Sequence, residues 1–433
     1  MVISLHSKFI PQYSEDVLYP SLCIPQEILE IILINAGEYT ENIWAIMLVS
    51  TEFRKIVLSL LPRVIRLTVS GIHLDSFPIL DSFTGVQYLE IQDDESWNYL
   101  DLRMFRESIW ENMKYLKISR RLAKQLASDS YSKYFLTNLY PTFFMPNLTS
   151  LDIADECYNF RDLDILPTTI PSLRKLKLSR CILEDIGHFK TLNILEIYHN
   201  PVDVIADLSK LNITELTLSG TNFSGFSKLN IPSLRKLKIK DCWQTTGSPN
   251  HLNLVELVLI NVSRTGNPKY MKKLNIPSLK SLTLGGSDLE EWMDWDSLYR
   301  FKIEELTLIG FDNNSVPDHI GQMSSIPSLK SLTLKMIYRF RVAELPNLES
   351  LVLVNSSLEI RNMRMEWLTN LDICTFRSNT GLDINRLNFP NLRSLNTYGH
   401  PQNINRQGML DRDWLRNIVV SSKYLESLHT VDL

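Results

Sequence analysis

The sequence predicts an α/β repeat fold, a solenoid with a curved parallel sheet on its inner face and short helices or turns outside, preceded by a small all-α helical head. The first observation is a repeated phrase. Residues 276–284 read Ile-Pro-Ser-Leu-Lys-Ser-Leu-Thr-Leu, and residues 326–334 spell the same nine letters. Near copies begin at Ile170 and Ile231. Internal self-similarity of this kind indicates a repeat architecture.

The second observation is the spacing of the copies. Each contains Leu-x-x-Leu-x-Leu, in which the last two leucines are two positions apart and therefore point to one side of an extended strand. In the central part of the chain, successive second leucines are separated by 19 residues (Leu176 to Leu195) to 26 residues (Leu306 to Leu332). These intervals are close to the roughly 20 to 29 residues of a leucine-rich repeat, and the chain resembles this family. The marker leucines are Leu67, Leu89, Leu116, Leu151, Leu176, Leu195, Leu216, Leu237, Leu257, Leu282, Leu306, Leu332, Leu351, Leu371, Leu395 and Leu428.

The repeat pattern divides the chain into three segments. Residues 1–20 are an N-terminal extension, and residues 21–62 are a helical domain. The expected solenoid occupies residues 63–433, with roughly 15–16 repeats and a C-terminal cap near 399–433. Because a repeat array grows without adding separate cores, the length does not require several globular domains.

Three segments interrupt the repeats. Residues 92–113 and 288–299 are acidic and aromatic, and we expect them to form helices on the outer side of the array. Residues 119–147 form a longer interruption that is rich in aromatic residues. Its favoured interpretation is packing on the adjacent repeat, and the alternative is contact with a partner, because long loops in compact domains are often functional.

Composition excludes several classes of protein. The formal net charge is -4 and the pI is about 6.1, which argues against a nucleic-acid partner. The five cysteines are odd in number and form no Cys-x-x-Cys pair, so we expect neither a zinc site nor a disulfide scaffold. Residues 1–19 contain no apolar stretch of signal-peptide length, and no run approaches the ~20 apolar residues of a membrane span. We therefore expect no membrane partner and a location in the cytoplasm, the nucleus or both.

The head differs from the repeats. Residues 21–61 lack the strand phrase and show short helical patterns instead, with Pro25 in a first turn and Gly37 at a helix end. A segment of this size is too small to bury all its large apolar residues by itself. It could be a cap that covers the first strand of the solenoid, because the ends of repeat arrays need covering. It could also be a docking module.

The order of residues in the head resembles the F-box. The segment opens with Ile-Pro-x-Glu-Ile at Ile24 and closes with Leu-Val-Ser-x-x-Phe-Arg at Arg54. The resemblance implies docking onto the Skp-type adaptor of a cullin-RING ubiquitin ligase. The residues that would meet the adaptor are Ile24, Pro25, Glu27, Ile28, Ile32, Val49, Ser50, Phe53 and Arg54.

The residues beside the marker leucines point away from the core and form the inner face of the array. In neighbouring parallel strands they lie in rows about 5 Å apart, so lysines and glutamates can neutralise one another across the rows. The alternative is a face that recognises a target protein. The candidate residues for such a face are Lys175, Lys177, Glu196, Tyr198, Glu215, Lys236, Lys238, Lys240 and Glu256.

The sequence contains no recognisable active site. No His-Glu-x-x-His, Gly-x-x-x-x-Gly-Lys or Gly-x-Gly-x-x-Gly occurs, so we expect no catalysis, no cofactor and no metal. The combined prediction is a substrate-recognition subunit of an SCF-type ubiquitin ligase, in which the F-box binds the Skp-type adaptor and the repeats bind a target protein. The alternative is a leucine-rich repeat scaffold without a role in ubiquitin transfer. A GTPase-activating repeat protein is a weaker alternative.

Overall fold

The structure is a computed structural model that divides into two compact units, residues 1–213 and 214–433, each of which is described by itself. It describes residues 2–5, 66–70, 84–92, 107–118, 144–154, 170–180, 189–200, 208, 210–223, 225–242, 247–262, 274–286, 302–310, 326–337, 340–342, 345–356, 358–360, 366–375, 390–399 and 427–432. The F-box-like head at 21–62 therefore lies outside the described residues. So do the second outer helix expected at 288–299, residues 119–143 of the long interruption, and residues 400–426 of the expected C-terminal cap.

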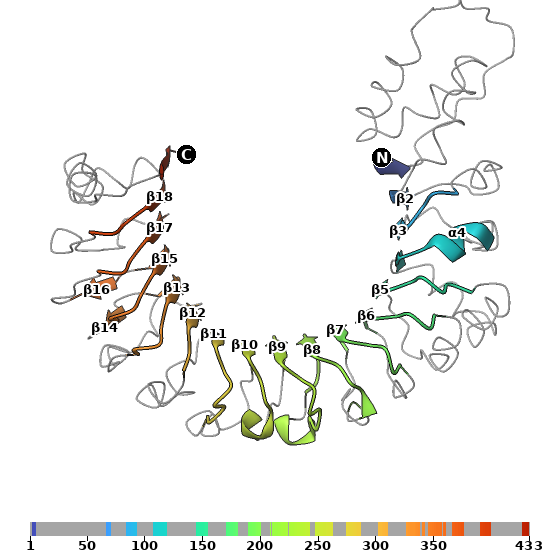
Figure 1. The fold of residues 1–433 in the computed structure, drawn as a ribbon, viewed down its shortest axis with the longest axis horizontal. Coiled ribbons are helices and arrows are strands. Elements are labelled where there is room, and N and C mark those ends of the chain that lie inside the picture. Colours follow the sequence, from blue (N-terminus) through green and yellow to red (C-terminus); the bar gives the residue numbers. More distant parts are fainter. Residues whose placement is uncertain are drawn as a thin grey trace, which may run out of the picture. The chain divides into compact units, whose positions relative to one another are not determined.

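The first unit contains a sheet of parallel strands. They are β1 (Val2–Leu5), β2 (Arg66–Ser70), β3 (Tyr88–Gln92), β4 (Tyr115–Ile118), β5 (Ser150–Ala154), β6 (Lys175–Ser179) and β7 (Ile194–Tyr198). Each strand pairs in parallel with the next. One short helix, α4 (Glu107–Asn112), lies between β3 and β4 in sequence and on the outer side of the strands (Figure 1).

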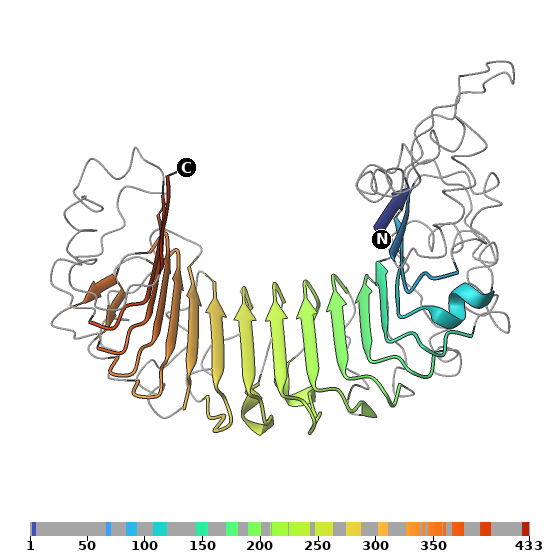
Figure 2. The same ribbon diagram turned by 45° about the horizontal axis from the view of Figure 1, so that its top comes forward.

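The second unit repeats this arrangement. Its strands are β8 (Glu215–Ser219), β9 (Lys236–Lys240), β10 (Glu256–Ile260), β11 (Ser281–Gly285), β12 (Glu305–Ile309), β13 (Ser331–Lys335), β15 (Ser350–Val354), β17 (Asn370–Thr375), β18 (Ser394–Gly399) and β19 (Ser427–Asp432). These strands also pair in parallel with their neighbours. Figure 2 shows β8 to β13 standing edge to edge.

The outer side of the second unit carries the remaining short elements. The 3-10 turns η9 (Phe226–Lys228) and η10 (Pro249–His251) precede β9 and β10. The strands β14 (Phe340–Val342) and β16 (Leu358–Ile360) form a separate two-stranded parallel sheet that the sequence did not predict. All four lie outside the main row of strands (Figure 1). No helix among the described residues is long and apolar enough to cross a membrane.

Alternation along each strand places the leucines in the core. In β6, Leu176 and Leu178 are fully buried, whereas Lys175 and Lys177 are half-buried. Equivalent leucines stand opposite one another across the ladder, as Leu282 does with Leu306. Because most strands send two large aliphatic side chains to the same side, stacking the repeats buries a continuous apolar layer. The predicted parallel solenoid is confirmed.

The repeated Ile-Pro-Ser-Leu phrase is the turn that enters each strand. The N–H of Leu279 donates to the carbonyl of Ile276 at 3.0 Å. The N–H groups of Lys280 and Ser281 both donate to one carbonyl of the preceding repeat, that of Val255, at 2.9 and 3.0 Å. The exposed proline between Ile276 and Ser278 has no N–H that needs a partner, and its fixed φ favours this turn. The phrase therefore sets both the turn and its attachment to the neighbouring repeat.

Two expectations change in the described regions. The N-terminal extension contains β1, whose register with β2 runs from Val2 opposite Arg66 to Leu5 opposite Val69. Residues 6–65, which include the F-box-like head, therefore connect two neighbouring strands of one sheet. Within the segment 92–113, expected to form an outer helix, Gln92 belongs to strand β3 and the structure describes the helix Glu107–Asn112, while residues 93–106 lie outside the described residues.

Candidate functional site

We define the inner face as the strand positions whose side chains point away from the leucine core. In the first unit its central row alternates in charge across five neighbouring strands. The register places Glu90 of β3 opposite Lys117 of β4, Lys117 opposite Asp152 of β5, and Asp152 opposite Lys177 of β6. Lys177 is in turn opposite Glu196 of β7.

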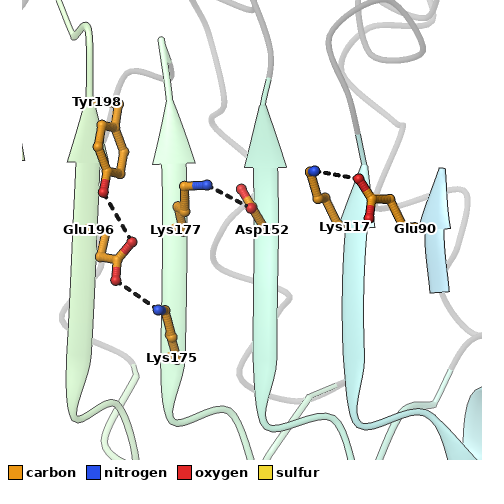
Figure 3. A network of polar contacts seen from close by, with 7 residues as sticks. All are labelled: Glu90, Lys117, Asp152, Lys175, Lys177, Glu196 and Tyr198. Carbon is orange, nitrogen blue, oxygen red and sulfur yellow. Dashed lines mark hydrogen bonds and ion pairs between the residues drawn. The ribbon is translucent and has the colours of Figure 1, made fainter. Parts of the chain in front are cut away.

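Ion pairs join these rows (Figure 3). Lys117 pairs with Glu90, and the Nζ atom of Lys177 lies 2.8 Å from Oδ2 of Asp152. Lys175, two residues before Lys177 on β6, reaches Oε1 of Glu196 at 2.7 Å. The structure thus brings together three candidate residues predicted from the sequence, Lys175, Lys177 and Glu196. Each of the two lysines is neutralised by a carboxylate of an adjacent strand.

Asp152 is unusual for an inner-face residue because it is 5% exposed. Its Oδ2 atom accepts a hydrogen bond from Lys177, whereas its buried Oδ1 atom has no hydrogen-bond partner among the described residues. A buried carboxylate depends strongly on its counter-charge, since removing the partner leaves an uncompensated charge in a medium of low dielectric constant. The Lys177–Asp152 pair is therefore the most constrained part of this row. The sequence did not single out Asp152.

Tyr198 completes the group. Its hydroxyl donates to Oε2 of Glu196 at 3.2 Å, and the Nζ atom of Lys177 lies 5.5 Å from the ring centroid. Burial, followed by the charge and hydrogen bond of Glu196 and the charge of Asp152, raises the pKa of Tyr198 to about 12. The phenol consequently stays protonated at neutral pH and remains a hydrogen-bond donor.

The second unit carries a similar ladder at its first strands. Lys236 of β9 lies 3.0 Å from Oε1 of Glu215 on β8, and Lys238 lies 3.0 Å from Oε1 of Glu256 on β10. The hydrogen bond and charge of Glu215 raise the pKa of Lys236. The neutralising ladder, which was the first interpretation of these positions in the sequence, describes Glu215, Lys236, Lys238 and Glu256. Lys240, the remaining candidate, has no ion pair with any residue that the structure describes.

The sequence missed a set of inner-face residues at the last position of the strands. In register with Lys240 lie Ile260 of β10, Gly285 of β11, Ile309 of β12 and Lys335 of β13. Alternation along the strand could have found them, because they occupy the same position relative to the marker leucine as Tyr198 and Lys240.

Beyond β10 the central row is almost neutral. Thr283, Thr307 and Thr333 follow one another in register on β11, β12 and β13. Further along, the Nδ2 atom of Asn396 on β18 donates to Oδ1 of Asp372 on β17 at 2.6 Å. These side chains offer hydroxyl and amide groups, which suit hydrogen bonding to another polypeptide.

The described residues contain no group of three or more His, Cys, Asp or Glu that could hold a metal ion. Within this part of the chain several polar groups of the inner face form ion pairs and hydrogen bonds between strands. Chemically, the arrangement can present charges, hydroxyls and apolar side chains to a partner. The F-box-like residues Ile24, Pro25, Glu27, Ile28, Ile32, Val49, Ser50, Phe53 and Arg54 lie outside the described residues.

One parallel strand per Leu-x-x-Leu-x-Leu copy, with its leucines stacked in register, defines the leucine-rich repeat class of solenoid. No family model matches the chain, and no curated protein matches it. Similar solved structures include an internalin (InlF) of Listeria monocytogenes, with 15% identity, a TM-score of 0.37, and coverage of 82% of this chain and 93% of that one.

Two further solved structures are similar to the chain, also at low sequence identity. The functional domain of InlJ of Listeria monocytogenes has 15% identity and a TM-score of 0.30, and the alignment covers 68% of this chain and 63% of that one. The Toll–Spatzle complex of Drosophila has 14% identity and a TM-score of 0.25, with 88% and 45% covered. At these identities the likeness concerns the repeat fold alone.

Proposed function

We propose that this chain is a leucine-rich repeat scaffold that binds another protein through its inner face. The observation that carries this proposal is the set of half-buried polar side chains that inter-strand pairs hold in fixed positions. Lys177 and Glu196 in the first unit and Lys238 and Glu256 in the second are examples. A surface whose side chains are already ordered loses less conformational entropy on binding, which favours recognition of a partner.

Site-specific photocrosslinking tests this proposal. A photoreactive benzoylphenylalanine is placed at Tyr198 or Thr307 on the inner face, and in matched controls at the exposed turn residues Lys190 or Lys302. In cell extract, we expect a discrete crosslinked protein from one or both inner-face positions and none from the turn positions. Crosslinking from the turns alone would contradict binding through the inner face.

The finer proposal is that the scaffold serves an SCF-type ubiquitin ligase as its non-catalytic substrate receptor. The Ile-Pro-x-Glu-Ile and Phe-Arg order between Ile24 and Arg54 supports it. The pairing of β1 with β2 also supports it, because the segment that carries this order starts and ends at neighbouring strands of one sheet. A head attached at both of its ends to the same sheet would stay close to the repeats. The ligase role further implies a location in the cytoplasm or the nucleus.

The mechanism of such a receptor is effective concentration. If the head holds the Skp-type adaptor and the repeats hold a target protein, the lysines of the target stay near the ubiquitin donor of the ligase. Linking two binding events in one chain makes the second event intramolecular. Catalytic residues are not required in this chain for that mechanism.

Adaptor binding tests the finer proposal. We expect the double variant Pro25→Ala and Ile28→Ala to lose copurification with the Skp-type adaptor, while its far-ultraviolet circular dichroism stays that of the wild type. The control is Gln26→Ala, at the variable position of Ile-Pro-x-Glu, which should keep the adaptor. Adaptor binding retained by the double variant would contradict docking through the F-box-like residues, on which the ligase proposal rests.

A further inference from the structure

One row of the inner face in the second unit differs from all the charged rows. It consists of Lys240, Ile260, Gly285, Ile309 and Lys335, which lie in register on the consecutive strands β9 to β13. We call these five residues the lysine-bracketed row. It has a positive charge at each end and apolar residues between.

The apolar part of the row is continuous. A Cβ atom built on Gly285 would lie 3.2 Å from Cβ of Ile309 and 3.3 Å from Cγ1 of Ile260. The two isoleucines therefore flank, from the strands on either side, the space that a side chain at Gly285 would take. Both isoleucines remain partly exposed. The result is an apolar surface on an otherwise polar face.

The two lysines at the ends of the row differ from the other inner-face lysines in their ion pairing. Seven lysines occupy inner-face strand positions among the described residues, and five of them pair with a carboxylate of an adjacent strand: Lys117, Lys175, Lys177, Lys236 and Lys238. Lys240 and Lys335 have no ion pair within the described part of the chain. Asp241 follows Lys240, but its Oδ1 atom accepts a hydrogen bond from Nδ2 of Asn261 at 2.8 Å. Neither lysine of the row is therefore neutralised by an ion pair with a described residue.

We propose that the lysine-bracketed row binds an acidic segment of a partner protein, with apolar side chains on Ile260 and Ile309 and carboxylates at Lys240 and Lys335. The proposal rests on the scaffold function and specifies the chemistry of its partner. Four strand spacings of about 4.8 Å separate the two lysines by about 19 Å, which corresponds to about six residues of extended chain. The complementary segment thus has two acidic residues about six positions apart with apolar residues between them.

Panning a random-sequence peptide library on the full chain tests the proposal. We expect the enriched peptides to show this acidic–apolar–acidic pattern. Their affinity should fall about tenfold in the double variant Lys240→Gln and Lys335→Gln, which corresponds to the loss of two exposed ion pairs. The variants Ile260→Thr and Ile309→Thr, which keep β-branched side chains, should also weaken binding. Circular dichroism and urea unfolding verify that each variant folds.

The matched control is the double variant Lys280→Gln and Lys330→Gln. It removes the same charge from the same unit, but these lysines pair with Glu304 at 3.2 and 3.0 Å, outside the row. Peptide affinity should therefore change little. Enriched peptides that are basic, or that bind the Lys240/Lys335 variant as tightly as the wild type, would overturn this inference and leave the scaffold function standing. Binding of a mixed-sequence oligonucleotide through Lys240 and Lys335, in place of acidic peptides, would also overturn it. If no peptide is enriched over a blank surface, this inference is contradicted, whereas the scaffold function is judged by the photocrosslinking experiment.

Discussion

At the residue scale, the position directly after each strand is the most regular backbone feature. Six such residues that are not glycine have positive φ, among them Arg180 at 60°, Asn261 at 51° and Met336 at 53°. The N–H groups of five of them donate to a carbonyl near the end of the next strand, as that of Met336 does to the carbonyl of Val354 at 2.7 Å. The left-handed conformation turns the chain out of the sheet while it keeps this bond. For residues with a Cβ atom the conformation costs about 1–2 kcal/mol.

Met336 offers a test of this cost, because its side chain is 38% exposed and contributes little to the core. We expect Met336→Gly to raise the free energy of unfolding by about 0.5–1 kcal/mol, since glycine adopts positive φ without strain. Urea unfolding followed by circular dichroism measures the change. A loss of stability would mean that contacts of the methionine side chain outweigh the backbone strain.

The control is the neighbouring glycine of the preceding repeat. A Cβ atom on Gly310 would lie 2.4 Å from the carbonyl oxygen of Met336, which is backbone and cannot move away freely. Gly310→Ala should therefore lower the free energy of unfolding, by about 1–3 kcal/mol as for other overpacked sites. The two variants are thus expected to change the free energy of unfolding in opposite directions, although both lie at the contact between Gly310 and Met336.

At the element scale, strand β6 carries two lysines whose partners differ in burial. Lys177 pairs with Asp152, whose side chain is 7% exposed, whereas Lys175 pairs with Glu196, whose side chain is 18% exposed and also accepts from Tyr198. Loss of Lys177 would leave the Asp152 carboxylate buried without a counter-charge. Loss of Lys175 would leave Glu196 with another hydrogen bond and with more access to water.

We therefore expect Lys177→Met to lower the free energy of unfolding by about 2 kcal/mol, a buried-pair effect reduced by the partial exposure of the lysine. Lys175→Met, on the same strand and facing the same side, should cost less than about 1 kcal/mol, as exposed pairs do. Chemical unfolding of both variants under one set of conditions measures the difference. Equal costs would show that burial of the carboxylate does not govern these pairs.

Elements were predictable from sequence where the repeat phrase is complete. The strand containing Leu282 was expected from Leu-x-x-Leu-x-Leu and is present as β11. Val2–Leu5 was not expected, because four residues of local sequence carry no repeat phrase, and the strand exists through its pairing with residues 66–69 far along the chain. The same reason explains why β14 and β16 were missed, since each has three residues and pairs with the other.

At the scale of the whole molecule, both units consist of repeats that contact mainly their neighbours. The stability of such arrays is approximately a sum of terms within repeats and between adjacent repeats. A core substitution should therefore act locally. Leu282 is fully buried in β11 and stands opposite Leu257 of β10 and Leu306 of β12.

We expect Leu282→Ala to lower stability by about 2–5 kcal/mol, the usual cost of a cavity in a core. In amide hydrogen exchange of the full chain, protection should fall most in β10, β11 and β12 and should change little in β6 of the other unit. Thr283→Ala, one residue further and on the inner face, is the control and should leave protection close to that of the wild type. Equal loss of protection in both units would mean that the chain unfolds as one cooperative body.

The sequence by itself determined the repeat, the leucines of the core, the residues that face away from that core, and the F-box-like order from Ile24 to Arg54. Only the tertiary structure decided which inner-face charges are paired. It showed that Asp152 is buried beneath Lys177, and that Lys240 and Lys335 bracket Ile260, Gly285 and Ile309. The reason is physical: partners in these rows are about 20 to 35 residues apart in sequence. Their contact depends on the register between strands and on the turns that set it, and no local pattern contains that information.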